Sequence, residues 1–329
     1  MPKSIGKPGL FFFLRLGVGV FLLLILARMV DFHHMAMTLA SVQPHLLAAA
    51  LLAMLLNYCL KTYRWALILW VQRPDISLAQ ITRFNFLSIF LGNFLPTNLS
   101  ADLVRIYYIS RTADSRAALS SIFADRIIGN FAVAIATIFA FLILRQTGLF
   151  QIGSILSYGI VAFLILSMAV PLLLQHTLVT SGIARIADRF SGKRLFAGLQ
   201  NISDQLLLYR KRPVVMAKVL SVAFLNVFVV IFEFYFIAKS FSTPISISYF
   251  FLFIPLLIYL TMLPVSIGGI GLVEAGFVFF FSKVGMSVEA CLSIALVFRV
   301  LQLTCALPGA MIYLLRNMSS AEVSARSVL

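Results

Sequence analysis

The stretch LPVSIGGIGLVEAGFVFFF, Leu263–Phe281, interrupts an apolar segment with residues that break helices and with one carboxylate. Pro264 ends a preceding helix, and glycine permits tight turns and close approach of the backbone. The three glycines that follow Pro264 most closely are Gly268, Gly269 and Gly271. Glu274 lies one helical turn after Gly271, where the N-terminal end of a helix dipole stabilises a negative charge. The stretch predicts a broken helix inside a membrane domain, since irregular backbone survives at membrane depth only where it is covered by protein or lines a wet cavity.

The composition of the whole chain is that of a polytopic membrane protein. Of its 329 residues, 61% are hydrophobic and 11% are charged, against about 25% charged in a soluble domain. Apolar runs long enough to cross a bilayer recur along the chain. We predict an all-α fold with six full spans, at residues 10–30, 46–70, 118–143, 152–174, 214–238 and 286–315.

Two more apolar regions, 79–111 and 247–283, are interrupted near the middle by proline with small or polar residues. The interruptions read NFLPTNLSAD and MLPVSIGGIG. Each region predicts a re-entrant hairpin of two short helices that enters and leaves on one side of the membrane. Asn98 lies in the first interruption and adds hydrogen-bonding capacity there.

Lys and Arg outnumber Asp and Glu by 26 to 11, and the predicted spans place most of them on one side. This bias predicts that both termini are cytoplasmic, and it argues against nucleic acid as a partner. The loop at 175–213 carries apolar residues at helical spacing among basic ones, which indicates an amphipathic segment on the inner surface. It is either a connector or a sensor of anionic lipid head groups. The cysteines and histidines show no metal or redox spacing, so we expect no metal and no cofactor.

The two interrupted regions resemble one another, which predicts a single membrane domain over 1–329 with repeated halves at about 79–143 and 247–315. Leu103-Val104-Arg105 aligns with Leu272-Val273-Glu274, and Leu119-Ser120 with Leu292-Ser293. In the same alignment Arg126 corresponds to Arg299. Three predicted spans separate the hairpins, so the repeats are expected to be inverted, as in many transporters.

Charged residues inside spans are costly, and they usually face the bundle interior and form pairs. Asp102 and Arg105 share a helix face, so Arg105 either pairs with Asp102 or binds a lipid phosphate. Asp125 and Arg126 are neighbours in the chain and are expected to have separate partners. Glu274 pairs with Arg299 or Arg126, or acts as a gate.

Arg299 near the middle of the last span requires an anionic partner, and Gln302 shares its face. Arg126 with Glu274, and Arg299 with Asp102 or Asp125, are further pairings that the sequence leaves open.

Four motifs stand out along the chain: YRWALIL (Tyr63–Leu69), NFLPTNLSADLVRIYYISR (Asn93–Arg111), ADRIIGN (Ala124–Asn130) and LPVSIGGIGLVEAGFV (Leu263–Val278). At these motifs the chain resembles the transmembrane domain of lysylphosphatidylglycerol synthase/flippase proteins and the wider flippase-like family. Ala101-Asp102 stands where the family usually shows Gly-Asp, and Asp125-Arg126 where Glu-Arg is common.

The resemblance implies translocation of a polar-headed, anionic or aminoacylated lipid across a bacterial plasma membrane. Alternatives are a membrane-embedded head-group transferase, or a non-transporting partner of a lipid-synthesis complex. In full-length relatives a soluble aminoacyl-transferase domain follows, and because this sequence ends at Leu329 without one, synthase activity is not expected. The residues expected to act on lipid are Asn98, Asp102, Arg105, Asp125, Arg126, Gly268, Gly269, Gly271, Glu274, Arg299 and Gln302.

Overall fold

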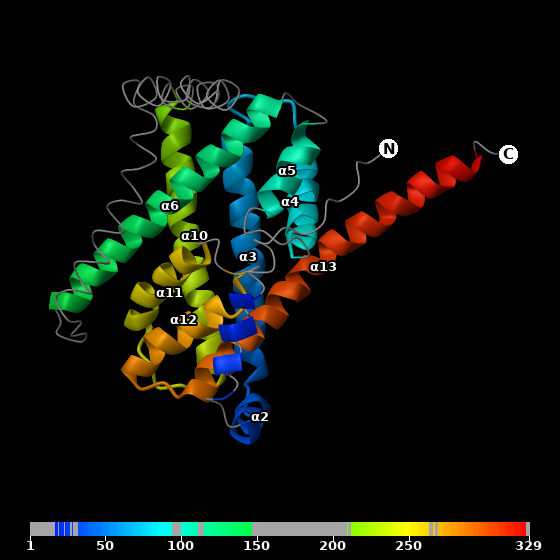
Figure 1. The fold of residues 1–329 in the computed structure, drawn as a ribbon. Helices are drawn as coiled ribbons and strands as arrows, with labels where there is room; N and C mark the ends of the chain where they lie inside the picture. Colours follow the sequence, from blue (N-terminus) through cyan, green and yellow to red (C-terminus); the bar gives the residue numbers. More distant parts are fainter. Residues whose placement is uncertain are drawn as a thin grey trace, which may run out of the picture. The chain divides into compact units, whose positions relative to one another are not determined.

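The computed structural model describes parts of 17–28, then 32–93, 100–110, 115–146, 209, 212–262, 266 and 269–326. All regular structure in these residues is helical (Figure 1). The predicted span at 152–174, most of the loop at 175–213, and Asn98 and Gly268 lie outside the described residues, as does much of the predicted first span.

Four described helices are long and apolar enough to cross a membrane: Pro44–Leu69, Ala117–Ile143, Pro213–Ser240 and Val288–Leu315. They belong to α3 (Pro44–Leu69), α6 (Ser115–Gln146), α10 (Pro213–Ser240) and α13 (Val288–Arg326). The predictions at 46–70, 118–143, 214–238 and 286–315 are therefore confirmed as helices of spanning length. Both α3 and α10 begin at a proline. Proline has no backbone N–H, and in the first turn of a helix that group would have no hydrogen-bond partner within the helix, so proline fits there.

The two interrupted regions each contain two short helices. The first region holds α4 (Leu78–Gly92) and α5 (Ser100–Ser110), and the second holds α11 (Ile247–Met262) and α12 (Leu272–Phe281). Ser77 starts α4 with a capping box, in which Gln80 N–H donates to Ser77 Oγ and Ser77 N–H donates to Gln80 Oε1, both at 3.3 Å. The helix breaks predicted from proline and glycine are present, while the re-entrant path of the hairpins stays a prediction.

The chain forms two compact units, each assembled from distant parts of the sequence. Unit 1 contains 1–54, 86–101 and 231–329, and unit 2 contains 55–85 and 102–230. One hydrophobic core cluster of unit 2 gathers around Trp65, which is fully buried. It is formed by Trp65, Ala66, Leu69, Ile76, Ile81, Ile109, Ala118 and Ile122.

Unit 1 has an aromatic core. In it α12 packs against α11 and α13, and α2 (Phe32–Ala40) packs against α13. Phe277 stacks on Phe281 with ring centroids 4.2 Å apart, and Phe234 stacks on Phe298 at 4.5 Å. Stacked and edge-on aromatic pairs add to the free energy of burial, so this packing fixes the position of α12 and of the break that precedes it.

Close helix contacts in unit 1 depend on glycine. A Cβ at Gly309 of α13 would lie 2.1 Å from the backbone oxygen of Phe86 on α4, so only glycine fits there. A Cβ at Gly276 of α12 would lie 2.6 Å from Leu257 Cδ2 on α11. These contacts bring the helix backbones closer together than larger residues allow.

Candidate functional site

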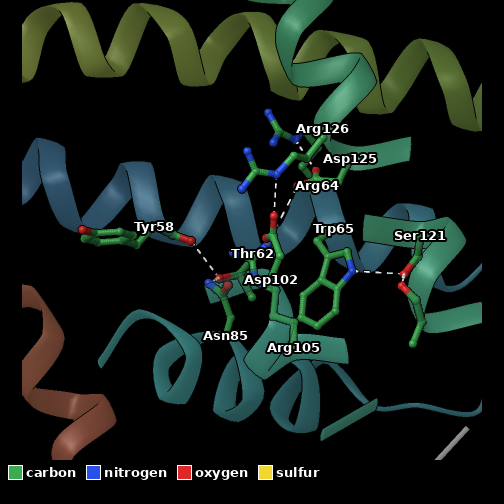
Figure 2. Close-up of polar contacts among 11 residues, drawn as sticks. Tyr58, Thr62, Arg64, Trp65, Asn85, Asp102, Arg105, Ser121, Asp125 and Arg126 are labelled. Carbon is green, nitrogen blue, oxygen red and sulfur yellow. Dashed lines mark hydrogen bonds and ion pairs between the residues drawn. The ribbon is translucent and has the colours of Figure 1, made fainter. Parts of the chain in front are cut away.

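The main charged site is a cluster of five side chains in unit 2, from α3, α5 and α6 (Figure 2). It joins three guanidiniums and two carboxylates, namely those of Arg64, Arg105, Arg126, Asp102 and Asp125. We call this set the charge cluster. Its formal charge is therefore one positive unit, carried within helices that are mostly apolar.

Arg64 of α3 and Asp125 of α6 form the most buried pair of the cluster. Arg64 Nε donates to Asp125 Oδ1 at 2.6 Å, and only 9% and 8% of the two side chains are exposed. The guanidinium lies against the backbone of α6, because a Cβ at Gly129 would be 3.3 Å from both Nη1 and Nη2 of Arg64. Asp125 and Gly129 are one turn apart on the same face. The carboxylate thus binds Arg64 while the glycine leaves room for it.

Asp102 and Arg126 form a second pair, in which Arg126 Nε donates to Asp102 Oδ2 (Figure 2). Asp125 and Arg126 therefore have separate partners, as their adjacent positions in the chain predict. The sequence also left open a pair between Arg126 and Glu274, which belong to different units, and that pair stays a prediction.

Arg105 lies between the two carboxylates at longer range. Its Nη1 is 3.7 Å from Asp102 Oδ1 and 3.9 Å from Asp125 Oδ2. The guanidinium also sits over the ring of Trp65, with Cζ 5.0 Å from the centroid. Trp65 is held in turn by the hydrogen bond from its Nε1 to Ser121 Oγ at 3.3 Å. The indole ring is thus held in place for a cation–π contact with Arg105.

A second polar site lies in unit 1, after the break that opens α12. Arg299 Nε of α13 donates to Glu274 Oε1 at 3.1 Å, and Gly271 N–H donates to Glu274 Oε2 at 2.7 Å. Gly269 and Gly271 have positive φ angles of 71° and 79°, a conformation that favours glycine. A Cβ at Gly269 would lie 3.8 Å from Arg299 Nη2. The glycines, Glu274 and Arg299 are therefore brought together as one site.

The remaining predicted site residues are Gln302, Asn98 and Gly268. Gln302 follows Arg299 by one turn on α13 and is half-buried. Asn98 and Gly268 lie outside the described residues.

Sequence reasoning missed Arg64, Trp65 and Gly129. Arg64 lies near the end of the predicted span 46–70, where the positive-inside bias already explains a basic residue. The signal that could have pointed to it is the carboxylate at Asp125, because a buried Asp in a span requires a cation. The preceding full span offers two, Lys61 and Arg64.

Comparisons with known proteins agree with the motifs. A comparison with curated proteins finds no match. Residues 12–309 match the family described as the lysylphosphatidylglycerol synthase TM region. The match includes all the predicted site residues, both helix breaks and the four described helices of spanning length, apart from the last residues of α13. The chain is therefore an integral membrane protein that belongs to the lysylphosphatidylglycerol synthase transmembrane-region family.

Proposed function

We propose that this protein translocates a polar-headed phospholipid, anionic or aminoacylated, between the leaflets of a bacterial plasma membrane. The observation that carries the proposal is the charge cluster, in which three guanidiniums face two carboxylates within helices of a membrane protein. A charge near the centre of a spanning helix costs roughly 2.5–3.5 kcal/mol on insertion scales. Retaining five charged groups in one place inside a membrane domain is costly for a domain that only has to fold.

The net charge of the cluster suits a phospholipid. A phosphodiester carries one negative charge, which balances the one positive unit that the five side chains leave. Guanidinium groups bind phosphate through parallel hydrogen bonds, and they are less strongly hydrated than ammonium groups. Hydrogen bonds from these guanidiniums replace the hydration that the phosphate loses when the phosphate leaves the membrane surface.

The ion pairs also provide a means of release. Asp102 pairs with Arg126, and Glu274 pairs with Arg299; in this proposal the lipid phosphate binds the same guanidiniums. Carboxylate and phosphate compete for the same guanidinium, so binding stays weak enough to reverse. Glu274 is well suited to act as a gate, since it joins the start of α12 to α13.

The helix breaks fit an alternating-access mechanism. In this proposal the breaks between α4 and α5 and between α11 and α12 mark two re-entrant hairpins of an inverted repeat, with both termini in the cytoplasm. The family description names a synthase, and the match covers its transmembrane region. We therefore propose that a lipid-synthesis enzyme supplies the lipid, and that this domain moves it.

The test is leaflet-resolved lipid flip in proteoliposomes made with the full chain. Fluorescent short-chain phosphatidylglycerol and lysylphosphatidylglycerol are placed in both leaflets, and the outer leaflet is quenched with a membrane-impermeant reductant. We expect flip above that of empty liposomes, with loss in Arg126→Gln and Glu274→Gln. The control is Arg83→Gln, which removes one charge from an exposed position on α4.

An absence of flip for every head group would contradict the proposal and would favour a head-group transferase or a non-transporting partner. Flip that Arg126→Gln and Glu274→Gln leave at the wild-type rate would show that the two polar sites are not on the lipid path.

A further inference from the structure

Arg126 is the member of the charge cluster that reaches the surface of its unit. Its side chain is 38% exposed, against 9% for Arg64 and 10% for Arg105. Asp102 accepts a hydrogen bond from Arg126 Nε and so orients the guanidinium. Arg64 and Arg105 are therefore buried inside the cluster, whereas Arg126 is accessible from the surface of the unit.

The surface around Arg126 on α6 is apolar. Leu119 and Phe123 precede Arg126 by seven and three residues, so all three lie on one face of the helix. Leu119 is 40% exposed and Phe123 is 38% exposed. In a membrane such a face meets acyl chains, so the guanidinium emerges beside hydrocarbon.

The position of Arg126 along the helix places it below the head groups. It lies nine residues after the start of the candidate span Ala117–Ile143, which corresponds to about 14 Å along a helix axis. The hydrocarbon core is about 30 Å thick, so this is close to the middle of an untilted span. An arginine at that depth is stable where a polar group joins it.

We propose that Arg126 holds the phosphate of a diacyl phospholipid against the exposed face of α6, with the acyl chains running along Phe123 and Leu119 towards the N-terminal end of the span, as in a lipid whose head group has moved inward from the opposite leaflet. The inference rests on the proposed function, because it names the place where the transported lipid enters from the side. The head group reaches the charge cluster through Arg126, and the chains stay in the bilayer. A free phosphate has no hydrocarbon that could pack on Leu119 and Phe123, so the proposed ligand is a lipid.

Binding is measured by native mass spectrometry of the full chain in detergent with three probes. Dioleoylphosphatidylglycerol has both phosphate and chains, dioleoylglycerol has the chains alone, and glycerophosphoglycerol has the head group alone. We expect retention of the first probe only. Equal retention of dioleoylglycerol, or competition by glycerophosphoglycerol at equal concentration, would overturn the site.

The variants separate Arg126 from the net charge of the cluster. Arg126→Gln is expected to weaken retention of phosphatidylglycerol by about tenfold or more, the effect of losing charge-assisted hydrogen bonds. Because this change leaves Asp102 without its arginine, the double variant Arg126→Gln/Asp102→Asn is measured as well. It keeps the cluster at one positive unit and should lose the lipid to the same extent, while Arg83→Gln should retain it.

The proposed site is overturned if the double variant binds phosphatidylglycerol as the wild type does, since net charge alone then holds the lipid. It is also overturned as an entry site if the double variant loses binding yet flips lipid at the wild-type rate, a result that leaves the proposed function intact. Binding through Arg126 in a protein that flips no lipid would support the site and contradict the proposed function.

Discussion

Glu274 forms two hydrogen bonds at once, one to the backbone that starts its own helix and one to Arg299 on the next. Its Oε2 accepts from Gly271 N–H at 2.7 Å, and its Oε1 accepts from Arg299 Nε at 3.1 Å. One carboxylate thus satisfies an N–H group that the start of α12 leaves open and neutralises a cation in a spanning helix. The local fold and the charge balance of unit 1 depend on the same side chain.

The same arrangement occurs in unit 2. Asp102 is the third residue of α5 and Glu274 is the third of α12, while Arg126 is the twelfth of α6 and Arg299 is the twelfth of α13. In both units an early carboxylate of the short helix binds the Nε of an arginine in the following long helix. This recurrence supports an internal repeat, while its inverted orientation stays a prediction.

The two roles of Glu274 can be separated by substitution. Glu274→Gln keeps an oxygen that can accept from Gly271 N–H but loses the charge that faces Arg299, whereas Glu274→Leu loses both. We expect both variants to abolish lipid flip. Glu274→Leu should also unfold more easily than Glu274→Gln, by about 1 kcal/mol for the lost helix cap. Thermal unfolding in detergent and flip in liposomes are the two measurements; equal unfolding temperatures for the two variants would contradict the capping role.

The four described helices of spanning length and both helix breaks could be predicted from sequence, because apolar length, proline and glycine act locally. The pairing of charges could not. Arg64 and Asp125 are 61 positions apart, and nothing in either helix selects the other as partner. The alignment of the two halves matched Arg105 with Glu274, whereas the helix starts match Asp102 with Glu274. A shift of three residues keeps the helix face, so the apolar pattern alone does not fix this register.

Gly129 is expected to set the position of Arg64. In Gly129→Ala the new Cβ lies 3.3 Å from both terminal nitrogens of Arg64, so the guanidinium has to shift by a few tenths of an ångström. We expect slower lipid flip with little change in the unfolding temperature. The control is Gly17→Ala, where a Cβ meets nothing within 4 Å. A wild-type flip rate in Gly129→Ala would show that the position of Arg64 does not matter for transport.

Gly309 is expected to be the least replaceable glycine among those described in unit 1. An alanine Cβ there would lie 2.1 Å from Phe86 O and 2.7 Å from Phe90 Cβ, so relief requires α13 and α4 to move apart. The clash at Gly276 is with the tips of Leu257 and Leu260, which can rotate away. Gly309→Ala should therefore destabilise unit 1 more than Gly276→Ala, beyond the roughly 1–3 kcal/mol typical of overpacking. Unfolding temperatures and yields in detergent test this order, and the reverse order would contradict the close contact between α4 and α13.

Tyr209 is expected to make the stability of unit 2 depend on alkaline pH. Burial raises the pKa of Tyr209 to about 12 from an ordinary 10.0, and Gln72 Nε2 donates to its hydroxyl at 2.7 Å. Because folding favours the neutral phenol, its contribution is complete below about pH 10 and is lost as the pH rises towards 12. The unfolding temperature of the wild type should fall more steeply than that of Tyr209→Phe between about pH 10 and pH 12. Tyr63→Phe, at an exposed position of α3, is the matched control. Parallel curves for the wild type and Tyr209→Phe would show that the phenol is not buried as described.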